Sequence, residues 1–256
     1  MPGLLAVDLK EGTKVVHADA ERSKFIKYFF KGEITPAIYG RFLISLYHVY
    51  TALETALDKC KDNANIQLIY YPVELARKEA LEQDLEFFNG PDWREMLSPV
   101  SPAQQAYIDA IRRCADTKPE LLIAHSYVRY LGDLSGGQIL AKKLQKYNDL
   151  PDGLGVAFYY FDRIEDKDGF KENYRKRLNQ VEVDDETHLA IIEESKQTFI
   201  RNIDIFAEFD HELDAIALPG HAAKKDQQPP TAASSTFSPA GLLNTLATAV
   251  GLKSSA

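Results

Sequence analysis

Three glycines and a carboxylate lie close together in the middle of the chain. Residues 130–138 hold three of the 14 glycines of this 256-residue sequence, and apolar residues on both sides repeat at helical spacing. Each glycine inside a helix costs about 1 kcal/mol relative to alanine, so we expect these glycines to serve a function. On a helix, Arg129, Gly132, Asp133 and Gly136 share one face. That face suits a flat ligand lying against the backbone beneath a carboxylate; the alternative is a glycine turn between two helices.

His17 is the candidate metal ligand. It lies on a predicted helix, and Glu21, one turn later, could orient the imidazole as a supporting carboxylate. The alternative for a single helical histidine is a packed or surface position. Glu208 and His211 show the spacing found in di-iron helix bundles, but that architecture requires the motif twice, and the sequence holds it once.

Composition restricts the classes of function. The hydrophobic fraction of 45% is enough for a sizeable core, and the net charge of −8 argues against a nucleic-acid partner, because such binding depends on neutralising phosphates. Cys60 and Cys114 form no CxxC pair and no disulfide framework, as expected in a reducing compartment. The sequence contains no Walker loop, nucleophile elbow or HExxH zinc motif, and we expect no signal peptide.

Prolines, glycines and cap residues divide the sequence into helices. We predict an all-α domain of seven or more helices over residues 1–216, with strand-like alternation only at 157–161. Residues 217–240 have the composition of a disordered linker, and residues 241–256 form a short, weakly apolar segment. The predicted helices cover residues 8–30 (opened by a capping box of Asp8 and Glu11), 36–59, 74–88, 102–114, a glycine-bearing helix opened by Pro119, 167–179 and 185–214.

The sequence resembles the animal-type haem oxygenases. The similarity extends from about residue 9 to 214 and rests on the His17 helix, on residues 45–50, 71–75 and 81–85, and above all on residues 127–138. The resemblance implies a single multi-helical domain that holds haem, as both substrate and cofactor, between a proximal and a distal helix. It also implies cleavage of haem by dioxygen and reducing equivalents to biliverdin (α isomer), carbon monoxide and ferrous iron.

The same resemblance implies roles for individual residues. His17 matches the proximal iron ligand, and Glu21 matches the carboxylate that supports it. Asp133 matches the residue that holds the water through which a proton is delivered. The distal glycines that let the backbone approach haem are Gly132, Gly136 and Gly137; the surrounding hydrogen-bond network matches Tyr50, Arg129, Tyr130, Tyr107 and Asn202; the propionate contacts match Lys10, Tyr127, Lys171 and Arg175.

Other interpretations of these residues stay open at the level of sequence. Each tyrosine alone could be core packing, and the basic residues near Lys171 could be a solvated face. A haem-binding sensor or carrier without turnover, and a thiaminase-like helical enzyme with another small substrate, are the alternative functions. The resemblance implies an electron donor similar to NADPH-cytochrome P450 reductase, with biliverdin reductase as a further partner of a monomer. The candidate docking surface for the electron donor is the basic cluster Lys142, Lys143 and Lys146, together with Arg177.

Two features depart from the family pattern. Gly12 stands where relatives often carry alanine, and we expect it to loosen the proximal helix slightly. Animal members are held at the endoplasmic reticulum by a C-terminal helix, but residues 237–252 fall short of the roughly 20 apolar residues of a spanning helix. We expect at most weak interfacial association, with a cytoplasmic domain at the cytosolic face of the endoplasmic reticulum.

Overall fold

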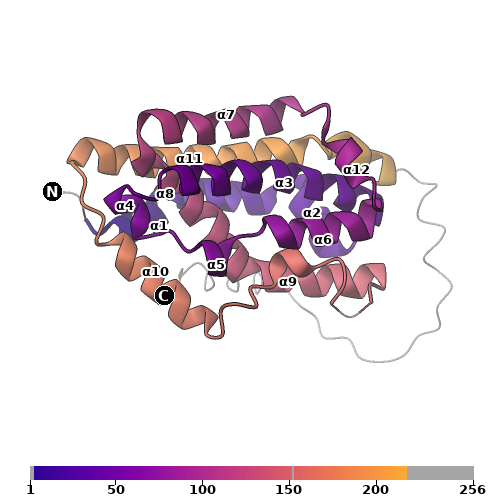
Figure 1. The fold of residues 1–256 in the computed structure, drawn as a ribbon. Coiled ribbons are helices and arrows are strands. Elements are labelled where there is room, and N and C mark those ends of the chain that lie inside the picture. Colours follow the sequence, from indigo (N-terminus) through magenta and orange to yellow (C-terminus); the bar gives the residue numbers. More distant parts are fainter. Residues whose placement is uncertain (1–2, 152, 218–256) are drawn as a thin grey trace, which may run out of the picture.

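Helices make up the regular structure of this protein. The computed structural model describes residues 3–151 and 153–217, and within those ranges there are helices and no strand (Figure 1). This confirms the all-α prediction. The α-helices are α1 (Leu5–Arg22), α2 (Lys24–Lys31), α3 (Pro36–Lys59), α4 (Ala64–Gln67), α5 (Pro72–Leu75), α6 (Lys78–Asn89), α7 (Pro102–Thr117), α8 (Leu122–Ser126), α9 (Gly132–Asn148), α10 (Lys167–Leu178), α11 (Asp185–Ala207) and α12 (Asp210–Ala217). Short 3-10 helices are η1 (Trp93–Leu97), η2 (Pro119–Leu121) and η4 (Ala157–Tyr159), whereas η3 (Tyr127–Leu131) is a π-helix.

Local capping chemistry explains where several helices begin. At the start of α3, the Thr35 hydroxyl accepts a hydrogen bond from the Ile38 amide, and Pro36 occupies the first turn; both features favour a helix start. Ser101 and Gln104 form a reciprocal capping box at the start of α7, a pattern that satisfies two otherwise unpaired amides. The predicted starts at residues 36 and 102 are confirmed for this reason.

Three predicted helices are each divided in two. The predicted helix 8–30 is broken at Ser23, whose extended backbone (ψ 152°) ends α1 and whose side chain caps α2. Ala76, also extended with ψ 134°, separates α5 from α6. The long C-terminal helix is interrupted between α11 and α12. Helical periodicity continues through each break, so the sequence pattern alone does not reveal them.

Two local predictions are wrong. α1 begins before the predicted capping box, and the Asp8 carboxylate instead contacts Nε2 of His188 at 2.9 Å. Residues 157–159 form the 3-10 helix η4, not a strand. Asp84 on α6 accepts hydrogen bonds from two successive amides of η4, at 2.9 and 2.8 Å, and this long-range contact fixes a tight turn.

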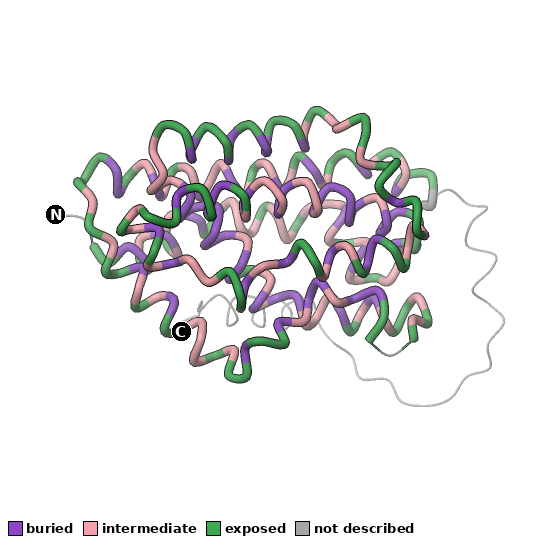
Figure 2. Tube along the Cα trace, in the orientation of Figure 1, coloured by how far each residue is buried: buried purple, intermediate pink, exposed green. Residues whose placement is uncertain are grey.

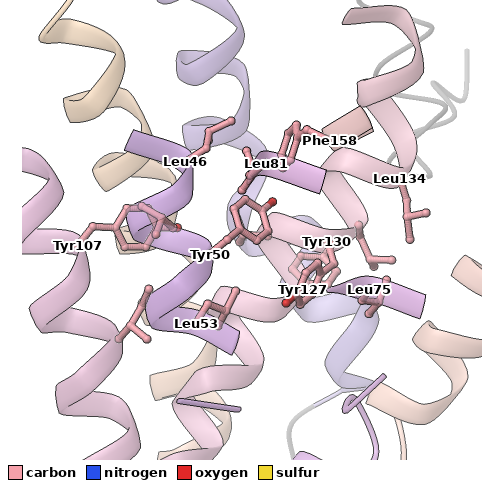
Figure 3. Close-up of a cluster of buried hydrophobic side chains, with 14 of the residues drawn as sticks. Leu46, Tyr50, Leu53, Leu75, Leu81, Tyr107, Tyr127, Tyr130, Leu134 and Phe158 are labelled. Carbon is pink, nitrogen blue, oxygen red and sulfur yellow. The ribbon is translucent and has the colours of Figure 1, made fainter. Parts of the chain in front are cut away.

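The core is built around α3. Its inward side chains are buried along most of its length, while α7 packs against it and exposes its outer face (Figure 2). Tyr50, in the middle of α3, is fully buried and lies near Tyr107 of α7, Tyr130 of η3 and Phe158 of η4 (Figure 3). The centre of the core therefore contains hydroxyl groups beside η3 and the start of α9, which together are called the distal segment below.

α1 packs along α11, and the two helices run in the same direction. Asp8 contacts His188, and one turn later Gly12 lies against Ile192. A Cβ added to Gly12 would come within 2.5 Å of the Ile192 Cγ2 atom. Gly12 thus has a packing role, which the expectation of a slightly loosened helix did not include.

The described ranges contain no helix that combines the length and the apolar character of a transbilayer span. The linker and terminal segment that we predict beyond Ala217 lie outside the described residues.

Candidate functional site

A pocket of about 150 Å³ lies between α1 and the glycine-bearing segment. Side chains of α1, α2, η3, α9 and α11 line it. The structure therefore brings together residues from both predicted halves of the site. The predicted site residues in its lining are His17, Glu21, Arg129, Gly132, Asp133, Gly136, Gly137 and Asn202.

His17 is poised to act as a metal ligand. Its Nδ1 atom lies 3.5 Å from Oε1 of Glu21, and its ring meets Phe199 edge-on with centroids 5.4 Å apart. Burial lowers the pKa of His17 and raises the pKa of Glu21. A neutral imidazole is the form that binds metal ions, so this environment favours ligation near pH 7.

The other described histidines have different surroundings. His125 is fully buried, and its Nε2 atom lies 3.1 Å from Glu194, whose carboxylate also contacts Arg201 at 2.8 Å. His188 contacts Asp8, and His211 is exposed on α12. Among the described histidines, His17 is the one that lines the pocket. His221 lies outside the described residues.

Cys114, His125 and Glu194 could in principle hold a cation, since their ligand atoms lie within 4.8 Å of one another. The Arg201 guanidinium already neutralises the Glu194 carboxylate. Burial also raises the pKa of the Cys114 thiol to about 12, which disfavours the thiolate that a metal needs. We therefore interpret this cluster as a buried polar network.

The distal glycines differ in their surroundings. A Cβ added at Gly132 would meet no atom within 4 Å, so the bare backbone there borders open pocket space. A Cβ at Gly137 would come within 2.9 Å of Cδ1 of Tyr159, so Gly137 instead permits close packing. The preceding π-helix η3 widens the backbone at Tyr127–Leu131, a distortion often found at functional sites. Gly132 is therefore the glycine that leaves space in the pocket, and Gly137 the one that allows close packing.

Asp133 lies at the centre of a polar network. The Tyr50 hydroxyl donates a hydrogen bond to its carboxylate, and Nη2 of Arg129 is 3.6 Å from Oδ1 of Asp133. Arg129 also donates to the Tyr50 hydroxyl at 3.1 Å and to Oδ1 of Asn202 at 2.8 Å. Burial raises the pKa of Asp133 well above its ordinary value. A buried carboxyl whose proton is so easily retained is suited to proton handling.

Tyr107 and Tyr130 lie outside the pocket lining. Both are buried, and burial raises the pKa of each, that of Tyr107 to about 12. Arg129 and Asn202 lie close to Tyr107, and both lower its pKa, against the effect of burial. Tyr130 borders a separate pocket with Glu54. Tyr50 thus contacts the Asp133 carboxylate directly, whereas Tyr107 and Tyr130 do not line the pocket.

A smaller pocket of about 50 Å³ continues from His17 towards α10. Thr13, Tyr127 and Arg175 line it together with His17 and Gly132. Lys171 does not line it; its Nζ atom pairs with Asp168 at 2.8 Å. Lys10, on α1, is also absent from the lining. Of the four predicted propionate contacts, Tyr127 and Arg175 are therefore the two that reach the pocket.

Sequence reasoning did not identify the apolar walls of the pocket. Phe199 and Phe206 of α11, Val128 of η3 and Leu140 of α9 form much of its surface. Their only sequence signal is helical periodicity, which also marks ordinary core residues. Only the packing of the helices separates wall from core.

Fold and site together define a helical protein with a slot that lies between a histidine-bearing helix and a glycine-rich helix. Residues 4–208 match the family model described as Heme oxygenase. The chain is 45% identical to heme oxygenase 1 of Homo sapiens over 214 residues, which cover 83% of this chain and 74% of that protein. It is 46% identical to heme oxygenase 1 of Synechocystis sp. over 209 residues, covering 82% of this chain and 86% of that protein. This chain belongs to the haem oxygenase family.

Solved structures support the same conclusion. The crystal structure of heme oxygenase-1 from Synechocystis sp. in complex with heme matches with a TM-score of 0.80 and 45% identity, covering 84% of this chain and 96% of that one. Heme oxygenase from Leptospira interrogans matches with a TM-score of 0.77 and 47% identity, over 80% of this chain and 100% of that one. Animal and bacterial relatives are similarly close, so the similarity establishes the family and not an animal subclass.

Proposed function

We propose that this protein cleaves haem with dioxygen and reducing equivalents to biliverdin (α isomer), carbon monoxide and ferrous iron. Membership of the family makes it a haem-degrading oxidoreductase. The observation that carries the proposal is that a neutral His17 and the bare backbone of Gly132, next to Asp133, line one slot. A sensor or carrier would need the histidine and the slot but not the buried Asp133 network.

The residues present fit haem as the bound group. His17 would ligate the iron, and Glu21 would orient the imidazole from 3.5 Å. The open space at Gly132 leaves room for a flat ring against α9, and the Arg175 guanidinium beside Tyr127 would pair with a propionate. When bound, haem supplies the iron centre at which dioxygen is activated.

The Asp133 network would hold and deliver the proton that oxygen chemistry requires. Tyr50 donates to the Asp133 carboxylate, and Arg129 fixes both groups through its bonds to Tyr50 and Asn202. Asn202 is oriented in turn, because its Nδ2 atom donates to the Thr198 carbonyl at 2.9 Å. A carboxyl held this way can order a water molecule and pass a proton through it.

The slot must widen when haem enters. Its cavity of about 150 Å³ is below the ~300–1,000 Å³ of typical small-molecule sites. We propose that α1 moves away from the distal segment to admit the ring.

The electron donor is proposed to dock on a basic surface after the distal segment. Lys143 and Lys146 of α9 lie over the Tyr147 ring, at 5.4 and 5.8 Å, and Lys142 precedes them. Arg177, on α10, lies over the Tyr71 ring and donates to the Gln67 carbonyl. The three lysines form the basic cluster, whereas Arg177 lies on α10, away from the C-terminal end of α9 (Figure 1). An acidic reductase surface would recognise the lysines through charge, so turnover supported by an NADPH-cytochrome P450 reductase-like donor should weaken at high salt.

A hemin titration followed by a turnover assay tests the proposed function. Hemin should give a histidine-ligated Soret band at one equivalent, and a reductase with NADPH should then produce biliverdin and carbon monoxide. Binding without biliverdin would favour the sensor or carrier, and no Soret shift at all would point to another substrate.

The proposed cellular location is the cytosol, at most weakly associated with the face of the endoplasmic reticulum. This proposal depends on the segment beyond Ala217, which lies outside the described residues. Cell fractionation of the full chain and of a version ending at Leu218 tests it. Carbonate-resistant membrane retention of the full chain alone would contradict weak association.

A further inference from the structure

A second cavity adjoins the haem slot at Asp133. It measures about 90 Å³ and shares five lining residues with the slot: Ile26, Arg129, Asp133, Leu140 and Phe206. Phenylalanines of α2, α3, α11 and η4 make up five of its eleven lining residues. Among the described residues that line it, the polar side chains are Arg129, Asp133 and Tyr159.

Tyr159 is held rigidly at this cavity. It is 2% exposed and belongs to η4, whose amides are fixed by the Asp84 carboxylate. Its ring packs on Gly137, where an added Cβ would lie 2.9 Å from Cδ1. Gly137 is one turn beyond Asp133 on α9, so the aromatic ring is anchored to the same helix that carries the carboxylate.

A second hydroxyl lies behind Tyr159. Tyr39 of α3 is fully buried, and its hydroxyl lies next to that of Tyr159. Burial raises the pKa of Tyr39, and Tyr159, Asp84 and Asp133 act in the same direction. Burial also raises the pKa of Tyr159; Tyr39 and Arg129 oppose the shift, and Asp133 and Asp84 add to it. Tyr159 and Asp133 line the same cavity, with Tyr39 beside Tyr159.

Buried hydroxyls are stable only when hydrogen bonds satisfy them, and water can supply those bonds. A 90 Å³ cavity with three polar groups in its wall is large and polar enough to hold water. We propose that Tyr159, which packs beside Tyr39, is a positioning residue for Asp133; this inference rests on the proposed function. The Tyr159 hydroxyl, which lines the cavity, holds cavity water that donates to the carboxylate, and this gives Asp133 a hydrogen-bonding partner besides Tyr50.

The test compares Tyr159→Phe and Tyr39→Phe with the matched control Tyr160→Phe. The Tyr160 hydroxyl donates to Gln145 at 3.4 Å and does not line the cavity, so the control removes the same atom from the neighbouring residue. Infrared titration of the haem-free protein reports the Asp133 carboxyl, whose band is identified by its loss in Asp133→Asn.

Tyr159→Phe should raise the Asp133 pKa, because a hydrogen bond to the charged form is lost. The expected gain in proton affinity is about 3–10-fold, since one pKa unit is a factor of ten. Tyr39→Phe should shift it in the same direction by less, and Tyr160→Phe should leave it unchanged. All three should bind hemin with wild-type affinity, while biliverdin formation slows in Tyr159→Phe with an altered solvent isotope effect.

An unchanged Asp133 titration in Tyr159→Phe would overturn the proposal, as would an equal shift in Tyr160→Phe. Failure of the proposed function has a different signature, because the wild-type protein itself would then give no Soret band with hemin. The haem-free titration is independent of that outcome.

Discussion

At the scale of single residues, the structure assigns different electrostatic tasks to the two ionisable groups of the slot. Burial lowers the pKa of His17 and raises that of Asp133, so both groups are biased towards their neutral forms. A neutral imidazole can ligate iron, and a protonated or hydrogen-bonded carboxyl can supply a proton. Burial against the apolar wall that includes Phe199 contributes to the first effect, and burial of the Asp133 side chain in the protein interior produces the second.

The prediction for His17 follows from its position as the described histidine that lines the slot. His17→Ala should still bind hemin, because the slot and Arg175 are retained, but it should lose the histidine-ligated spectrum and at least about tenfold in turnover. Added imidazole should restore both. His211→Ala, which changes an exposed histidine on α12, serves as the control. Wild-type spectra in His17→Ala would show that another group ligates iron.

Asp133 is predicted to control the outcome of oxygen chemistry more than haem affinity. Asp133→Ala removes the acceptor of the Tyr50 hydroxyl and the group that orders the delivering water. Hemin affinity should stay within about threefold of wild type, while biliverdin yield falls by about tenfold or more and peroxidase-like oxidation of added phenols rises. Product chromatography measures both changes. A normal biliverdin yield would contradict the proposed role.

At the scale of elements, the helical glycines Gly132 and Gly12 have different structural roles. Gly132 borders open space, and Gly12 brings α1 against Ile192 of α11. Helix propensity alone would favour alanine at both positions by about 1 kcal/mol. The distinction therefore depends on what the neighbouring helix places opposite each glycine.

Alanine substitutions should separate these two tasks. Gly132→Ala should leave the free energy of unfolding unchanged or higher by up to about 1 kcal/mol, yet weaken hemin binding by about tenfold. Gly12→Ala should lower the free energy of unfolding by about 1–3 kcal/mol, because a Cβ at 2.5 Å forces α1 from Ile192. Urea unfolding of the haem-free protein and hemin titration measure the two effects. If both variants lose the same property, the assignment is wrong.

α10 is predicted to orient haem in its plane through Arg175. This side chain lines the pocket beside Tyr127, whereas Lys171 is paired with Asp168. Replacing both Lys171 and Arg175 by Gln should give mixed biliverdin isomers in place of the α isomer, and Arg175→Gln alone should produce most of that change. Chromatography of the isomers decides between them. A pure α product from the double variant would place the anchor elsewhere.

At the scale of the whole molecule, buried carboxyls tie stability to pH. Asp84 is 1% exposed, and burial raises its pKa from 3.8 to about 6, although the amides of Phe158 and Ala157 oppose the shift. The folded state therefore binds this proton more tightly than the unfolded state between pH 4 and 6. The contribution to stability is present at low pH and is lost as pH rises through that window, by about 3 kcal/mol.

Asp84→Asn should remove this dependence. Urea titration at pH 4, 5, 6 and 7 measures the free energy of unfolding of both proteins. The wild-type value relative to the variant should fall by about 3 kcal/mol as pH rises. Glu193→Gln, on the exposed side of α11, serves as the control for a general charge effect. If the difference in unfolding free energy between wild type and variant does not vary with pH, the raised pKa of Asp84 is contradicted.

The sequence by itself determined the class of fold, most helix positions and the central chemistry. Thr35 with Pro36 and Ser101 with Gln104 are local signals, because a cap and its amide lie within a few residues. The glycines around Asp133 and the helical His17 likewise form patterns that are visible in a short window, and the resemblance they carry is confirmed at the level of the family.

Only the tertiary structure decided which side chains meet. Tyr50 and Asp133 are 83 positions apart, and Arg129 and Asn202 are 73 apart; their contact depends on how α3, η3 and α11 pack. The same packing brings Tyr159 and Asp133 to one cavity. Periodicity shows which face of a helix is buried, but the neighbour against which it is buried is set by long-range packing that no local pattern encodes.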